Sequence, residues 1–180
     1  MALTRVTNDG LDLSAKDESL NGVTVGRGAG NVASNTVVGN NALDANTSGS
    51  NNTAIGDESL SENTTGAQNV GVGAVSLYSN TSGNRNIGIG YQSLDANTTG
   101  DDNVAVGKSA LSANTIAHDN IAVGSSALAS NTTGDRNVAI GFQALEENTT
   151  ANDNTAVGYQ ALEENTTGTQ NVAVGANALD

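Results

Sequence analysis

The stretch "NVAVGANAL" at residues 171–179 recurs as "NVAIGFQAL" at residues 137–145 and as "NTAVGYQAL" at residues 154–162. The glycine within this stretch returns every 17 residues, without a gap, from Gly39 to Gly175. Self-similarity at a short fixed period is typical of a solenoid, in which each repeat packs only on its neighbours. The repeat therefore decides the fold, and we number each unit from its glycine as position 0.

Other positions of the unit are almost as constant as the glycine. Position 4 is always leucine, position 3 is alanine or serine, and positions 7 and 13 are asparagine in every complete unit. Before the glycine, β-branched residues alternate with alanine or glycine, a period of two that favours a strand, and glycines interrupt every window in which a helical stripe could form. The unit predicts two short extended pieces, "NxAVG" and "xxALxxN", joined by bends at the glycine and at "TTGxx".

Strands that recur in the same order predict an all-β fold, a parallel β-roll or β-helix solenoid of 17-residue coils. Coils stacked about 4.8 Å apart would make a rod of roughly 40 Å. Identical residues then form ladders of leucine, of valine and isoleucine, and of asparagine, whose amides can bond to the same residue in the next coil. The predicted ladder residues include Leu94, Asn97, Asn103, Leu111, Asn114, Asn120, Leu128, Asn131, Asn137 and Leu145.

Composition agrees with thin, regular layers, because aromatic residues make up 2% of the chain and glycine occurs 22 times. Without cysteine, the chain can form neither disulfides nor a cysteine metal site. The net charge of −13 comes from 19 acidic and 6 basic residues with no basic patch, so nucleic acid and anionic membrane are not expected partners. No stretch approaches the ~20 apolar residues that span a bilayer.

Two regions divide the chain. Residues 1–21 lack the repeat and are expected to form an N-terminal cap or attachment segment, whereas residues 22–180 form the repeat domain, with regular units from about residue 39. "GVTVG" at residues 22–26 is the expected first strand. At the other end the sequence stops within a coil, which predicts truncation, a covering partner or end-to-end stacking.

Energetics favour self-association. One coil offers about three large apolar side chains, worth ~1.5–3 kcal/mol each when buried, against an ordering cost of ~1–2 kcal/mol for every residue. In "NVAVGANAL" we expect Val172, Val174 and Leu179 in the core and Ala173 on a small-residue face that another chain can approach closely. The chain is therefore predicted to be a homotrimer.

The motif N-x-A-[VI]-G-x-x-[AS]-L resembles the repeats of trimeric autotransporter adhesin heads, which are left-handed parallel β-rolls with a shorter repeat. It also resembles the "NTTGxxNTAIGYQAL" arrays of bacteriophage tail fibres and of fibre-type bacterial surface proteins. The resemblance covers residues 22–180, and the opening "MALTRVTNDGLDLS" is similar to the start of some tail-fibre proteins. Because the signal peptide, stalk and membrane anchor of the autotransporters are not in the sequence, the resemblance favours the phage fibres.

Residues that could carry chemistry are few, and we expect neither an enzyme nor a bound cofactor or metal. The pairs Glu146 with Glu147 and Glu163 with Glu164 occupy the same two repeat positions and are interpreted as solvated turns, and His118 as a surface residue. A second acidic set could suggest calcium, but its positions also accept glutamine and arginine, so structural turns are the preferred interpretation. That set comprises Asp101, Asp102, Asp119, Asp135 and Asp153.

The variable position after each glycine holds Tyr91, Phe142 and Tyr159. Exposed rings on a rod could stack on the sugars of a host glycan, or could fill gaps between chains of the oligomer. The expected function is a structural and adhesive segment of a phage tail fibre or similar extracellular appendage. The alternatives are a bacterial adhesin head and a self-stacking extracellular filament. Expected partners are copies of the chain, a host surface glycan or protein, and a virion or appendage baseplate that binds the N-terminus.

Overall fold

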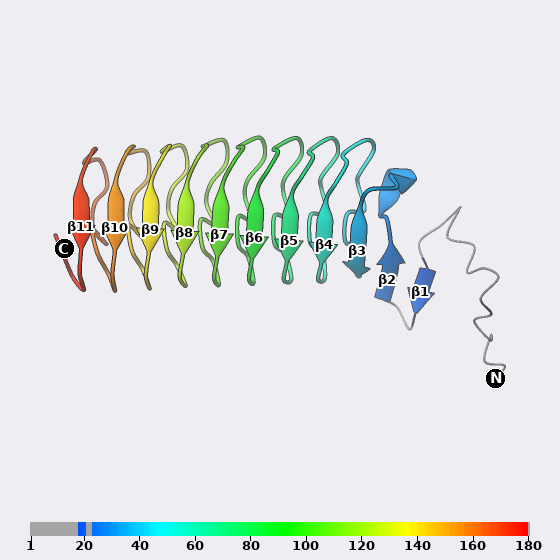
Figure 1. Ribbon diagram of the computed structural model, residues 1–180, viewed down its shortest axis with the longest axis horizontal. Helices are drawn as coiled ribbons and strands as arrows, with labels where there is room; N and C mark the ends of the chain where they lie inside the picture. The colour runs from blue at the N-terminus through cyan, green and yellow to red at the C-terminus, as the bar shows by residue number, and fades with distance from the viewer. Residues whose placement is uncertain (1–17, 21–22, 180) are drawn as a thin grey trace.

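The computed structural model describes residues 18–20 and 23–179, which form a β-solenoid rod with β1 and β11 at opposite ends (Figure 1). This confirms the all-β parallel solenoid of 17-residue coils. Residues 1–17, most of the predicted N-terminal segment, lie outside the described residues. The elements are β1 (Glu18–Leu20), β2 (Val23–Gly26), the 3-10 helix η1 (Ala29–Asn31), β3 (Thr36–Gly39), β4 (Thr53–Ile55), β5 (Val70–Val72), β6 (Ile87–Ile89), β7 (Val104–Val106), β8 (Ile121–Val123), β9 (Val138–Ile140), β10 (Thr155–Val157) and β11 (Val172–Val174).

The strands form one sheet in chain order. From β3 to β11 every pair is parallel and shifted by one whole unit, so that Val104 lies beside Ile121 and Ala105 beside Ala122. The "GVTVG" stretch contributes β2, but β2 pairs antiparallel with β3, and β1 pairs antiparallel with β2. Only residues 27–35 connect β2 to β3, which is fewer than the dozen or more that a parallel crossover needs. Parallel stacking therefore begins at β3.

Each coil contains one strand rather than the two extended pieces predicted. The segment "xxALxxN" is a turn, in which positions 2 and 4 both adopt left-handed backbone angles, as Gln92 (φ 55°) and Leu94 (φ 52°) show. Two left-handed residues separated by one other residue reverse the chain tightly. Leucine rarely adopts this conformation because its Cβ crowds the backbone, so the letters of the repeat favoured a strand instead.

The interior of each coil is lined by leucine at position 4 and by small residues. The leucines of this column from Leu43 to Leu145 are fully buried, and the middle residue of each strand, such as Ala105, points inward. Valine and isoleucine on either side of it point outward. The placement of Val172 and Val174 in the core is thus wrong, since they are 69% and 70% exposed, and so is the placement of Ala173 between chains, since it is 2% exposed.

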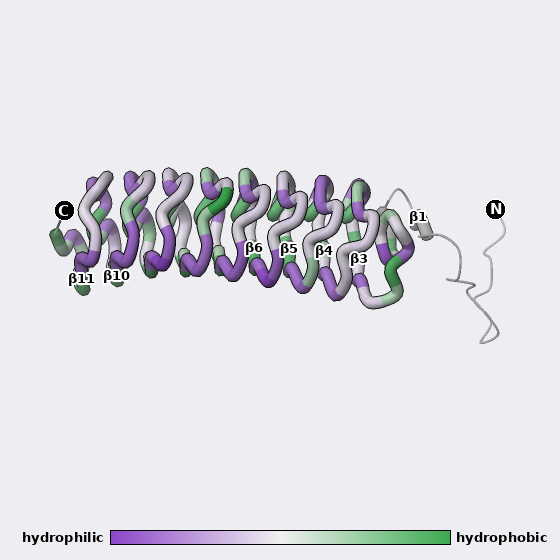
Figure 2. Tube along the Cα trace, turned by 90° about the horizontal axis from the view of Figure 1, so that it is seen from above, coloured by the Kyte–Doolittle hydropathy of each residue, from purple (hydrophilic) through white to green (hydrophobic). Residues whose placement is uncertain are grey.

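Leucine at position 4 and the middle residue of the strand fill the interior together. That middle residue is alanine or glycine from β4 to β11, and in β3 it is Val37, which is 1% exposed. Leu179, in the last described coil, is exposed as well, unlike the leucines of the preceding coils. Figure 2, which colours the chain trace by hydropathy, shows hydrophilic turn segments aligned from coil to coil along the rod.

Two asparagine ladders hold the turn segments in register. At position 7, Asn97 Nδ2 donates to Asn80 Oδ1 (2.9 Å) and to the carbonyl of Gly100 (3.1 Å). At position 13, Asn86 Nδ2 donates to the same carbonyl (2.7 Å), while Asn86 Oδ1 accepts the backbone N–H of Asn103 (3.0 Å). Both ladders therefore meet at the carbonyl of position 10, which is paired although it is buried. The residues predicted for the ladders are all buried: Leu94, Asn97, Asn103, Leu111, Asn114, Asn120, Leu128, Asn131, Asn137 and Leu145.

Candidate binding surface

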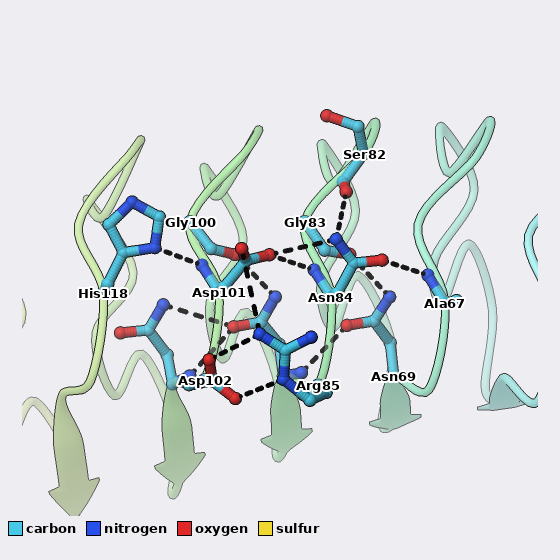
Figure 3. Close-up of polar contacts among 12 residues, drawn as sticks. Ala67, Asn69, Ser82, Gly83, Asn84, Arg85, Gly100, Asp101, Asp102 and His118 are labelled. Carbon is cyan, nitrogen blue, oxygen red and sulfur yellow. Dashed lines mark hydrogen bonds and ion pairs between the residues drawn. The ribbon is translucent and has the colours of Figure 1, made fainter.

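Polar side chains at positions 11 and 12 form hydrogen bonds and ion pairs between neighbouring coils (Figure 3). At position 11 the side chain of one coil accepts the backbone N–H of the preceding coil. Asn84 Oδ1 accepts from Ala67 (2.9 Å), and Asp101 Oδ1 accepts from Asn84 (2.6 Å). His118 Nδ1 accepts from Asp101 (2.9 Å), and Asp135 Oδ1 accepts from His118 (2.8 Å).

These residues differ in chemistry but share an acceptor atom at the same distance from the backbone. Because His118 Nδ1 accepts a hydrogen bond, the neutral ring carries its proton on Nε2 in this arrangement. His118 is exposed, as predicted, and its two hydrogen bonds hold adjacent turns together.

Position 12 carries two ion pairs between neighbouring coils. Arg85 Nε and a terminal nitrogen contact both oxygens of Asp102 (2.6 and 2.7 Å), and Arg136 contacts Asp153 in the same way (2.7 and 3.2 Å). Hydrogen bonds from the guanidinium groups lower the pKa values of Asp102 and Asp153 below that of an ordinary aspartate. Since both pairs are exposed, they fix the geometry of the turn more than they stabilise the fold.

Four of the five aspartates predicted for this turn contact protein groups through their side chains, and among the described residues Asp119 makes no side-chain hydrogen bond. Asp101 and Asp135 accept backbone N–H groups, and Asp102 and Asp153 bind arginine. Calcium needs six to eight oxygen ligands. Within residues 18–20 and 23–179, no group of three or more histidine, cysteine, aspartate or glutamate side chains could hold a metal ion. The turn network therefore explains these four aspartates by their own hydrogen bonds.

The opposite turn, at positions 5 and 6, is acidic and has no lysine or arginine at either position. The pKa of Tyr78 in this turn is raised, mainly by the negative charge of Glu62. Burial, the charge of Glu58 at position 2, and Asp95 raise it further. Burial also raises the pKa of Asp95. The four glutamates that the sequence pairs, Glu146, Glu147, Glu163 and Glu164, belong to this turn.

The aromatic residues at position 1 are half-exposed, as Tyr91, Phe142 and Tyr159 each show. Phe142 and Tyr159 lie in adjacent coils and stack, with ring centroids 5.5 Å apart and planes inclined by 11°. Tyr91 lies three coils from Phe142, ~14 Å along the rod, so the structure does not bring it to the pair. Next to the stacked rings, Gln160 Nε2 donates to Gln143 Oε1 (3.3 Å).

Gln143 in turn donates to the carboxylate of Glu146. The two rings therefore form one partly exposed apolar patch, in which each ring covers one face of the other, and Gln143 and Gln160 follow them directly in the chain. This combination suits a sugar ring, whose faces are apolar and whose rim carries hydroxyls. The stacking of Phe142 and Tyr159 follows from their spacing of one unit in the sequence. The column of hydrogen-bond acceptors at position 11, in contrast, was not predicted. Its signal was the run of acceptor residues Asn84, Asp101, His118, Asp135 and Asn152.

Comparison of the chain with protein-family models, curated proteins and solved structures finds no match. In the described part of the chain, no helix has the length and apolar character to cross a membrane. The class of protein supported at this point is a parallel β-solenoid with a regular interior and a variable exterior. Its resemblance to fibre repeats stays a prediction.

Proposed function

We propose that this chain is a rigid rod segment of an extracellular fibre, such as a phage tail fibre, which assembles as a homotrimer and contacts a host surface. The observation that carries the proposal is the division of each coil into constant buried positions and variable exposed turns. Leucine and asparagine columns hold the interior, whereas positions 1, 5, 6 and 12 change from coil to coil. In such a protein the constant interior keeps the rod stiff, while the variable turn residues can contact other molecules.

Stiffness follows from hydrogen bonds around the whole coil. The coil that begins at Gly90 bonds to its neighbours in the sheet, as between Val104 N–H and the Asn120 carbonyl (2.8 Å). It also bonds in the turns, as between Leu94 N–H and the Ala110 carbonyl (3.0 Å). Bending the rod would have to break bonds on one side of every affected coil, so a straight spacer is the mechanical role that this structure suits.

Recognition is assigned to the stacked pair Phe142 and Tyr159. Two half-exposed rings with a glutamine directly after each can stack on a host glycan, and aromatic contacts of this kind contribute ~0.5–1.5 kcal/mol each beyond their buried area. The substitutions Phe142→Ser and Tyr159→Ala test this, because Ser125 and Ala176 occupy the same column.

We expect the double variant to bind host cells or a glycan array at least ~10-fold more weakly than the wild type, as loss of ~1.4 kcal/mol predicts. The matched control is Tyr78→Ser, which removes a ring from a different column where serine also occurs, as at Ser61. Equal binding by all three proteins would remove the rings from the proposal. A flexible, bent particle in small-angle scattering would contradict the rod itself.

A further inference from the structure

We propose that the outward face of the sheet is the surface through which copies of this chain pack against one another. The sheet face comprises the outward residues at positions 14 and 16 of β3 to β11. Its members are Thr36, Val38, Thr53, Ile55, Val70, Val72, Ile87, Ile89, Val104, Val106, Ile121, Val123, Val138, Ile140, Thr155, Val157, Val172 and Val174.

The sheet face is exposed yet uniform. Ile89, Ile121 and Ile140 are 39%, 39% and 40% exposed, and no charged residue occurs at either position in any coil. At the exposed turn positions, in contrast, acidic, basic, polar and small residues replace one another from coil to coil. Strand propensity alone would admit threonine and tyrosine throughout, but valine or isoleucine fills all but three places. A long apolar surface without charge is typical of an interface.

The occupant that fits this surface is a second copy of the chain. Side chains on the sheet face repeat every ~4.8 Å along the rod, and a partner must share that spacing to interdigitate over the whole length. An identical chain has the same spacing by construction. Each copy has a net charge of −13, and most of the acidic residues of the coils lie on the turns at positions 5, 6, 11 and 12. Pairing through the sheet face therefore keeps the acidic residues of one copy away from those of the other.

The apolar area is comparable to that of a specific interface. A valine or isoleucine side chain offers ~100 Å² of apolar surface. Four isoleucines of the face are 39–40% exposed, Val172 and Val174 are 69% and 70% exposed, and the other nine valine and isoleucine residues are half-buried, which gives ~400–600 Å² per copy. Two copies then bury ~800–1,200 Å², around the ~1,000 Å² expected of a specific interface.

This assignment rests on the self-association in the proposed function but not on host binding. It also replaces the small-residue face that the sequence analysis assigned to the contact between chains, because those residues point inward. The face is only as wide as one three-residue strand is long, so two copies can pack sheet against sheet at ~10 Å, and three can meet around an axis.

The test is a triple variant with Ile89→Lys, Ile121→Lys and Ile140→Lys, whose mass in solution is measured by light scattering at micromolar concentration. The matched control places the same three charges on exposed threonines of the turns, with Thr99→Lys, Thr133→Lys and Thr150→Lys. We expect oligomers for the wild type and the control, and a monomer for the sheet-face variant, with association weakened at least ~100-fold.

A second variant guards against failure to fold. Replacing the same three isoleucines by threonine keeps β-branched residues, and threonine already occurs on this face at Thr53 and Thr155. This variant should retain the far-ultraviolet circular dichroism of the wild type and dissociate at ~10-fold higher concentration. Either a dimeric or a trimeric wild type that responds in this way supports the sheet face.

Two results would overturn the inference. If the wild type is an oligomer and both sheet-face variants keep its mass, the interface lies elsewhere, and the proposed self-association survives without this face. If the wild type is a monomer, the face is not an interface between copies and the assembly part of the proposed function fails too. Host binding by the ring variants is measured separately and decides neither result.

Discussion

The coil that begins at Gly56 has Ser59 and Gly71 at two interior positions where most other coils have alanine. Replacing each of them by alanine tests how tightly the coil is packed. A Cβ atom added at Gly71 would lie 2.5 Å from Ser59 Oγ and 3.3 Å from a carbon of Leu60. Ser59 is fully buried, and its hydroxyl is the one buried side-chain polar atom without a hydrogen bond among the described residues. Coils from Gly107 onward have alanine at both places.

Gly71→Ala alone should destabilise the chain. Overpacking costs ~1–3 kcal/mol, and the lower backbone freedom of alanine returns ~0.5–1 kcal/mol, which leaves a net loss of up to ~2.5 kcal/mol. Ser59→Ala alone should stabilise it by ~1 kcal/mol, because an unpaired buried hydroxyl is removed. In the double variant the clash disappears and both gains remain, so we expect a stability ~1–2 kcal/mol above the wild type.

The measured quantity is the free energy of unfolding in urea for the four proteins of this cycle, followed by circular dichroism. The coupling between the two substitutions should be ~2 kcal/mol or more in the favourable direction. A Gly71→Ala protein as stable as the wild type, or one that Ser59→Ala does not rescue, would refute the packing argument. Ser76→Ala is the control, because Ser76 Oγ donates to the Gly88 carbonyl (2.8 Å), and its loss should destabilise the chain.

Three further predictions concern the turns. Asn114→Ala removes the hydrogen bond to Asn97 Oδ1 (2.8 Å) within a buried ladder, and urea unfolding should show a loss of ~2–4 kcal/mol. Val75→Asn should raise the melting temperature, because a β-branched residue with φ 58° is strained by ~1 kcal/mol that asparagine relieves. Arg85→Gln should return the pKa of Asp102 from its lowered value towards ~3.9 in an NMR titration. Since the folded-state pKa is the lowered one, the wild type gains stability from this pair above pH ~4 and loses it as pH falls through the folded value, whereas the variant should lose less.

The length of the coil and its ladders could be predicted from the sequence because stacking places residues one unit apart side by side. The positions of Leu94, Asn97 and Asn103 in these ladders were predicted from that spacing alone. The inward face of the strand could not be predicted in this way. Both sides of "NVAVG" are uniform along the chain, so alternation does not show which one is buried. Only the folded coil shows that the middle residue of the strand points toward the leucine column while its two neighbours point outward.

The candidate site was predictable to a similar degree. The exposed position of Phe142 and Tyr159 followed from the variability of their column, and their separation by one unit puts the rings within stacking distance. The network around Asp101 was not predictable, because its partners are a backbone N–H and a histidine nitrogen that only the folded turn brings together. Repetition thus shows which residues lie side by side in a column, but not which of their side-chain and backbone atoms form hydrogen bonds.

The buried first asparagine ladder also bears on where such a chain can be made. Asn63, Asn97, Asn131 and Asn148 each begin an Asn-Thr-Thr triplet, the acceptor for N-linked sugar in the eukaryotic secretory pathway. Those enzymes act while a chain is still unfolded, and a sugar on Asn97 would displace its amide from Asn80 and Gly100. Production in a secretory host should therefore yield chains that are modified and unable to stack, whereas bacterial cytoplasm leaves every amide free for its neighbour.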